Sequence, residues 1–429
     1  MFPALIQSIQ KNYSTNHLKF FEIAFLSLML MSLPSIEAPK NIFIAGYILT
    51  AIWRQFQKKE SQPWNLWDWI FFGYIGSALL SALFAGISPG DEWRGFRGIA
   101  LWTSFGWIVA RSDFTQKEIT WIVWVTILGT LPPLAWGLIE YMIIHTKDSL
   151  QLHSVGHSNH SAIYLGIILG AMLSLSLSIW RGMGIFKKLG LILLPILFFT
   201  AIIIGQSRGV FGVSLVRISL IILLIPNAKK IKAFAFVIFA IVLALMPIMN
   251  AAIIEKQIAN QNNHDVLSDR GRVWNVSIEA AHFHPIFGIG NGNWSHITLE
   301  DLKKSRKERG LPFDDSIYSI SAGHSHSLYL TSLVERGIVG LIVLITFMSG
   351  WLFTIIRSYM SLKTTPQGSY VWGASLSAWI VTFGVGFVNS TFHHEHALLA
   401  LLFLGLHLSY LKYHKINYKN KSYVQLHKK

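Results

Sequence analysis

The chain has 429 residues, of which 52% are hydrophobic and 13% are charged, and its mean hydropathy is +0.46. Soluble domains carry about 25% charged residues, so this composition excludes an ordinary soluble protein and predicts one embedded in a membrane. The formal net charge is +15, but no motif of interleaved basic and aromatic residues indicates a nucleic-acid partner. The absence of cysteine excludes disulfides, thiolate chemistry and Cys-ligated metals.

Apolar runs recur along the chain and predict an all-α polytopic membrane protein with about 12 transmembrane helices, since a span needs about 17–25 residues. The predicted spans are residues 19–36, 40–55, 66–87, 95–110, 119–143, 160–180, 187–204, 209–225, 231–250, 327–356, 370–390 and 396–412. The N-terminal sequence lacks a cleavage signal, so the first span is expected to remain as an anchor. The predicted organisation is helices 1–9 in residues 1–250, a periplasmic loop at 251–326, helices 10–12 in 327–412 and a basic cytoplasmic tail at 413–429.

Lysine and arginine accumulate in every second short connection, which indicates that these connections and both termini lie in the cytoplasm. The basic groups are Arg54/Lys58/Lys59, Arg111/Lys117, Arg181/Lys187/Lys188, Lys229/Lys230/Lys232, Arg357/Lys363 and the tail from Lys412. The net positive charge is therefore explained mainly by topology, and residues 251–326 are expected on the external side.

Residues 251–326 are far longer than an ordinary connection and are expected to be partly helical. A helix is predicted over residues 251–261, and a second one is predicted to begin at Ser268 or Asp269 and to end near Pro285. A loop of this kind is usually a lid, a binding platform or a docking surface.

Within this loop, Trp274, Ile278 and Ala281 share one face of the second helix, which is expected to lie against the membrane or the bundle. The glycine-rich GIGNGNW (288–294) is interpreted as a turn, because no strand precedes it as a dinucleotide-binding loop would require.

Arginines occur at two places where a positive charge is unfavourable: between two apolar spans and at the start of a predicted helix. Arg208, in GQSRG between two apolar spans, costs about 2.5–3.5 kcal/mol at membrane depth unless it reaches the interface or binds an anion. Arg270 and Arg272 lie near the start of the loop helix, where a bound anion would be favourable; the alternative is a solvated charge. Arginine suits phosphate because its planar fork donates two parallel hydrogen bonds.

His326 follows a polar stretch at the point where an apolar span begins. A neutral imidazole is a common general base, and the alternative is a histidine that satisfies a helix-end carbonyl. Trp93, Arg94 and Arg97 lie at another external helix entrance, where they face either lipid headgroups or the same anion.

Histidines also cluster in three other segments and raise the question of zinc. The clusters are His153/His157/His160, His282/His284 and His393/His394/His396. Neither a HExxH pattern nor cysteine partners accompany them, so no metal site is predicted and they are interpreted as interface residues.

Short motifs lie at the ends of the apolar spans around the long loop. The pattern H-[NSQ]-x9-G-x-x-G is matched in full by His326, Ser327, Gly337 and Gly340. The others are Ser207-Arg208-Gly209, Arg270 four residues before Trp274 with HPIFGIG following at 284–290, and GHSNHSA at 156–162, which contains Asn159. In these motifs the chain resembles the O-antigen ligase family, within the superfamily that also contains O-antigen polymerases. The resemblance covers residues 150–410.

The resemblance implies an inverting, metal-independent transfer of a glycan from undecaprenyl diphosphate to a sugar hydroxyl of lipid A–core, at the periplasmic face of the cell inner membrane. Arg208 and Arg270 are then expected to stabilise the diphosphate, and His326 to take the hydroxyl proton. No cofactor is expected, and the partners are the lipid-linked O-antigen, lipid A–core and membrane lipids. The further predicted substrate-binding residues are Arg272, His324, Ser327, Asn159, Arg94 and Arg97.

Two alternatives remain beside the ligase. An O-antigen polymerase or a protein O-oligosaccharyltransferase would share the donor and the arginines, and the full histidine motif favours the ligase over the polymerase. A transporter could bind a lipid-linked diphosphate without reaction, but transporters commonly show repeated halves and the sequence shows no such repeat.

Overall fold

The computed structural model describes residues 17–57, 62–153, 155–249 and 270–426, with 246–249 and 414–426 described by their backbone alone. Every regular element in these parts of the chain is a helix, which confirms the predicted all-α class for them. The bundle elements are α2 (His17–Ser32), α3 (Glu37–Phe56), α4 (Leu66–Leu83), α5 (Glu92–Arg111), α6 (Gln116–Gly129), α7 (Leu131–Ile139), η1 (Glu140–Ile144), α8 (Ser158–Ile179), α9 (Ile185–Ile204), α10 (Arg208–Leu224), α11 (Lys229–Met249), α15 (Leu328–Leu362), α16 (Pro366–Trp379), η4 (Ile380–Gly384) and α17 (His394–Leu426). Between α11 and α15 lie α13 (Arg270–Ala280), η2 (Asn293–His296), α14 (Leu299–Glu308) and η3 (Asp315–Ile317).

Six helical segments of the described chain are long and apolar enough to cross a bilayer, which identifies a membrane protein. They are Leu66–Leu83, Gln116–Ile144, Ser158–Ile179, Ile185–Ile204, Leu328–Leu362 and His394–Tyr413. The other predicted spans also coincide with helices, such as α3, α5 and α10, and the count of twelve stays a prediction.

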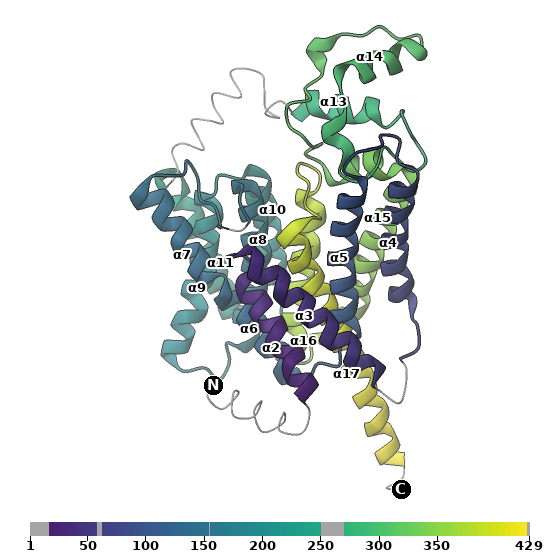
Figure 1. Cartoon of the computed structure of the whole chain (residues 1–429). Helices are drawn as coiled ribbons and strands as arrows, with labels where there is room; N and C mark the ends of the chain where they lie inside the picture. Colours follow the sequence, from purple (N-terminus) through teal and green to yellow (C-terminus); the bar gives the residue numbers. More distant parts are fainter. Residues whose placement is uncertain (1–16, 58–61, 154, 250–269, 427–429) are drawn as a thin grey trace.

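Figure 1 shows these helices as one bundle, with α13 and α14 at one end. At the opposite end α2 begins and α17 ends, as the predicted orientation requires. Which end faces the cytoplasm stays a prediction. The predicted helix at 251–261 and the predicted cap at Ser268 or Asp269 lie outside the described residues.

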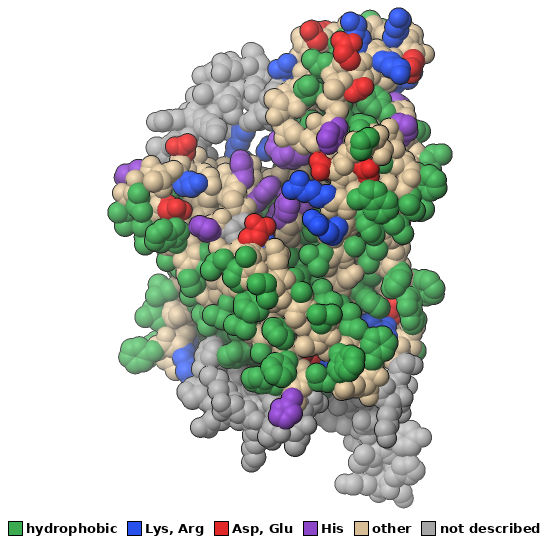
Figure 2. Space-filling view, in the orientation of Figure 1, with side chains coloured by type: hydrophobic (Ala, Val, Ile, Leu, Met, Phe, Trp, Pro, Cys, Tyr) green, Lys and Arg blue, Asp and Glu red, His purple; other side chains and the backbone are tan. Residues whose placement is uncertain are grey.

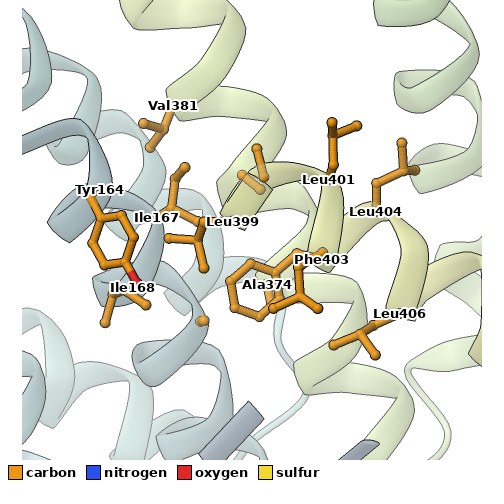
Figure 3. Close-up of a cluster of buried hydrophobic side chains, with 14 of the residues drawn as sticks. Tyr164, Ile167, Ile168, Ala374, Val381, Leu399, Leu401, Phe403, Leu404 and Leu406 are labelled. Carbon is orange, nitrogen blue, oxygen red and sulfur yellow. The ribbon is translucent and has the colours of Figure 1, made fainter. Parts of the chain in front are cut away.

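The centre of the bundle is formed by α8, α16 and α17. Their apolar side chains interlock in Figure 3, with Tyr164 and Ile168 of α8 facing residues of α16 and α17. Gly170 and Gly373 allow the close crossing of α8 and α16. A Cβ on Gly170 would lie 1.7 Å from the hydroxyl oxygen of Ser377, and one on Gly373 would lie 2.3 Å from that of Ser174. Small residues at such crossings are how membrane helices approach each other.

The loop unit packs onto the bundle through α13 and the glycine-rich turn. α13 buries Val273, Val276 and Ala280 against a second small core that includes Val334 of α15. Of the face predicted from Trp274, Ile278 and Ala281, Ala281 packs against this core and Ile278 is 53% exposed. That this face lies against the membrane or the bundle stays a prediction.

α15 is interrupted at Gly337, whose backbone has φ +63° and ψ −165°. The segment 285–290 fits into this break and takes over its hydrogen bonds: Ile338 N donates to the Pro285 carbonyl at 2.8 Å, and Ile289 N donates to the Val334 carbonyl at 2.9 Å. A Cβ at Gly337 would lie 2.3 Å from the Ile286 carbonyl oxygen. Gly337 thus allows a loop backbone to enter the helix. The predicted turn at 288–294 is confirmed by the positive φ of its glycines.

Candidate functional site

Several helices begin beside the loop unit, and the predicted residues lie at those beginnings. Arg208 opens α10, Arg270 opens α13 and His326 lies just before α15. Helix N-termini carry partial positive charge from their unpaired N–H groups, so this end of the bundle favours anions before any side chain is counted. Figure 2 shows histidine and basic side chains gathered around a hollow below the loop unit.

The structure brings Arg208 and Arg270 together. Both are half-buried, and Arg208 follows a sharp turn in which Gln206 has φ +56°. Burial and, second, the neighbouring Arg208 guanidinium lower the pKa of Arg270. Two guanidinium groups in each other's field are unfavourable by Coulomb's law, and a multivalent anion between them would remove that cost.

Arg272 is directed elsewhere. It is exposed, and its Nη2 donates to the Tyr318 carbonyl at 3.1 Å, so it ties α13 to the 318–320 segment. Of the two arginines that the sequence left open, Arg270 is the one placed beside Arg208. The roles of both stay predictions.

His326 is held by the serines that flank it. Ser325, which is fully buried, donates to the Ser327 carbonyl at 2.7 Å, and Ser327 caps α15 by accepting from Leu330 N at 3.5 Å. His326 itself has φ +50°. Ser327 is 4% exposed, so its contacts are those of a structural cap, although the sequence predicted it as a substrate contact.

The surroundings of the His326 imidazole favour its neutral form, which can act as a base. Burial first, and then the charges of His324 and Arg270, lower the pKa of His326 to about 4, so the ring is neutral at pH 7 and has a free lone pair. Its Nδ1 is buried and has no hydrogen-bond partner among the described residues. The alternative of a histidine bonded to a helix-end carbonyl therefore has no support at Nδ1. The rings of His324 and His326 lie 4.1 Å apart.

Further histidines come from α8 and from the residues around the start of α17. The His160 ring lies 4.9 Å from His393 and 5.4 Å from His396, and His160 and His157 also act electrostatically on His326. The predicted contact Asn159 lies in the first turn of α8, where its backbone N–H donates to His157 Nδ1 at 3.2 Å. Two of the three sequence clusters thus join the site, an assembly that the sequence did not predict.

Two of the remaining histidines contact other parts of the chain. His153 Nδ1 contacts the Ser35 carbonyl at 3.0 Å, and His284 lies against Gly86. Among the residues that the structure describes, no group of three or more His, Asp or Glu has a metal-holding arrangement.

Arg94 and Arg97 lie on the first turns of α5. Both are exposed, and Arg94 acts electrostatically on His394. Neither is among the charges that act on the pKa of His326, where Arg270 is the acting arginine. The sequence predicted these arginines as substrate contacts, and that role stays a prediction.

The fold and this site define a polytopic helical membrane protein with a cationic, histidine-rich site at one end of its bundle. Residues 192–345 match the family model described as O-antigen ligase, so this part of the chain is similar to that family. The match includes Arg208, Arg270 and His326 but not α5 or α17. No curated protein matches the chain.

Proposed function

We propose that the protein is an O-antigen ligase that transfers a glycan from undecaprenyl diphosphate to a sugar hydroxyl of lipid A–core at the periplasmic face of the inner membrane. The observation that carries the proposal is the placement of Arg208 and Arg270 together, with His326 in the field of Arg270. A cationic pair beside a neutral imidazole is what a transfer from a diphosphate to an alcohol needs.

The arginines act on the leaving group. When the anomeric C–O bond breaks, the electron pair stays on the diphosphate oxygen, and the growing negative charge is stabilised by the two guanidinium groups. Each guanidinium donates charge-assisted hydrogen bonds, which contribute about 1.5–3 kcal/mol each. The half-buried position of both arginines strengthens these bonds by reducing solvent screening.

His326 acts on the nucleophile. Its imidazole takes the proton of the acceptor hydroxyl while the oxygen attacks the anomeric carbon from the face opposite the diphosphate, which inverts the configuration. The diphosphate also raises the pKa of His326, because it neutralises the arginine field that lowers it. Donor binding thus turns a weak base into a stronger one.

The proposal is tested by reconstituting the purified protein in lipid nanodiscs with the lipid-linked O-antigen and lipid A–core, in buffer containing EDTA. We expect glycan-extended lipid A–core in the wild type and its loss in Arg208→Ala and Arg270→Ala. An Arg270→Ala protein that transfers at the wild-type rate would overturn the assignment of the diphosphate site. Transfer that requires an added divalent ion would overturn the metal-independent mechanism.

Orientation is tested separately by cysteine labelling, since the chain contains no cysteine. Glu300→Cys on α14 is expected to react with an impermeant maleimide from the periplasmic side, and Lys232→Cys in α11 only after the membrane is opened. The reverse pattern would place the site in the cytoplasm and remove the proposed function.

A further inference from the structure

Arg94 and Arg97 carry charges that the transfer chemistry above does not use. They lie three residues apart on the first turns of α5 and so share a face. Arg94 has 79% of its side chain exposed and approaches Asp91 at 3.8 Å, the limit of an ion pair. Among the described residues no carboxylate pairs with Arg97. The two exposed cations therefore have little compensating charge from ion pairs among the described residues.

The start of α5 is fixed in place by the glycine-rich turn of the loop unit. The side chain of Asn293 accepts from Asp91 N at 2.6 Å and donates to the Ile87 carbonyl at 2.8 Å. A Cβ on Gly95 would lie 2.5 Å from the Asn291 carbonyl oxygen, so α5 and the turn are in direct backbone contact. The segment 285–290, which leads into this turn, fills the break of α15, so the start of α5 is fixed relative to the helix that follows His326.

A row of imidazoles connects this position to the transfer site. The charges of Glu395, Lys40 and Glu37, and after them that of Arg94, act on His394. The His394 ring lies 4.4 Å from His393. The His393 ring lies 4.9 Å from His160, and His160 in turn acts on His326. The histidines thus separate two cationic pairs, one from α10 and α13 and the other from α5.

We propose that Arg94 and Arg97 form a second anion site, which binds a phosphate or carboxylate group of the acceptor glycolipid. This inference rests on the proposed transferase function, because it assigns the acceptor to that site. The donor diphosphate then lies on the Arg208–Arg270 side of His326 and the acceptor on the α5 side. Neutral imidazoles between them can both donate to and accept from sugar hydroxyls.

The arrangement has a chemical consequence for acceptor choice. A glycolipid with anionic groups near the accepting sugar is bound by charge at α5 and presents its hydroxyl toward His326. A neutral acceptor lacks that attachment and relies on hydroxyl contacts alone. The site therefore selects phosphorylated or carboxylated acceptors through binding, without altering the step at the anomeric carbon.

The experiment measures binding of phosphorylated lipid A–core and of its dephosphorylated form to the protein in nanodiscs of zwitterionic lipid. In the double variant Arg94→Gln/Arg97→Gln we expect the phosphorylated acceptor to bind about tenfold to hundredfold more weakly, in line with charge-assisted hydrogen bonds. Binding of the dephosphorylated form and of the lipid-linked donor should stay at wild-type values. The matched control is Lys303→Gln/Lys304→Gln, which removes two exposed charges from α14 and should change neither.

Three results would overturn the proposal. The first is equal weakening for phosphorylated and dephosphorylated acceptor, and the second is wild-type acceptor binding in the double variant. The third is a loss confined to an anionic phospholipid such as phosphatidylglycerol, added as a competitor, which would make this a headgroup site. Melting temperatures of the two double variants check that both fold.

The binding assay also separates this inference from the proposed function. A wild type that binds phosphorylated acceptor through Arg94 and Arg97 but transfers no glycan would overturn the transferase and leave the anion site. A wild type that transfers glycan, together with a double variant that keeps its acceptor affinity, would overturn the anion site and leave the transferase.

Discussion

The two ends of the bundle differ in the charges that neighbour their buried and half-buried cations. Where α2 begins, cations are matched by carboxylates: Lys19 lies 3.6 Å from both Glu22 and Glu118, and Arg111 lies 2.7 Å from Asp68. Beside the loop unit, the largest charge acting on Arg270 is another arginine. Paired charges hold helices together, whereas two guanidinium groups in each other's field favour the binding of an anion.

The largest expected effect tests the chemical use of the second end. His326→Asn keeps a residue that tolerates the positive φ of this position but removes the base. We expect transfer to fall by about 10²–10⁴-fold, with donor binding near the wild-type value. Rates come from the reconstituted assay and affinities from labelled donor. A variant with normal turnover, or one that no longer binds donor, would show that the histidine is structural.

The next prediction addresses the paired end. Glu22 is fully buried, contacts Arg54 and Lys19, and accepts from Ser112 at 2.9 Å. Glu22→Gln leaves buried cations without their partner, which costs about 3–5 kcal/mol of stability, and the melting temperature should fall sharply. Glu37→Gln is the control, because Glu37 is 77% exposed and lies 3.9 Å from Lys40. If both variants melt alike, the pairing does not stabilise the bundle.

A third prediction sharpens the distinction between the two loop arginines. Arg270→Ala should weaken donor binding by about tenfold to hundredfold, as expected for lost charge-assisted bonds. Arg270→Lys should recover only part of the donor affinity, because lysine lacks the planar fork of arginine. Arg272→Ala removes a bond to the Tyr318 carbonyl and should leave donor affinity unchanged. A larger donor effect from Arg272 would reverse the assignment.

The smallest effect is in the pH dependence. The pKa of His326 is lowered to about 4, so the base is neutral above that pH and is lost as pH falls through it. The kcat/KM profile, which reports the free enzyme, should therefore fall only at acidic pH. The kcat profile should fall at a higher pH, because the bound diphosphate raises the pKa. Coincident acidic limbs for the two profiles would contradict the coupling between donor and base.

Much of the fold follows from the sequence because apolar length is a local property. Each predicted span coincides with helix, and the turn at 288–294 follows from its glycines. The burial of Val273 and Val276 did not follow from the sequence, because the side of a helix that is buried depends on its partners, which here include Val334 of α15. Two residues along a helix differ by about 200° in direction, which is why Arg270 and Arg272 point to different places.

The candidate site was predictable only in part. Arg208, Arg270 and His326 could be found one at a time, since each interrupts an apolar or helical pattern. The gathering of His160, His393 and His396 could not be found in this way, because it depends on how α8 packs against α17. A hint was present in the sequence: both segments place histidines where a helix begins.

The break at Gly337 changes where the loop unit ends. Sequence places that boundary at residue 326, yet the backbone of 285–290 is bonded to α15 on both sides of the break. Residues 328–336 are therefore bonded to the loop unit as well as to the bundle, since Ile289 N donates to the Val334 carbonyl at 2.9 Å and Leu328 N donates to the Gly386 carbonyl at 2.8 Å. A chimera that exchanges loops between relatives should be joined after Gly337. A junction at 326 would combine the turn of one protein with the broken helix of another, whose break fits a different turn.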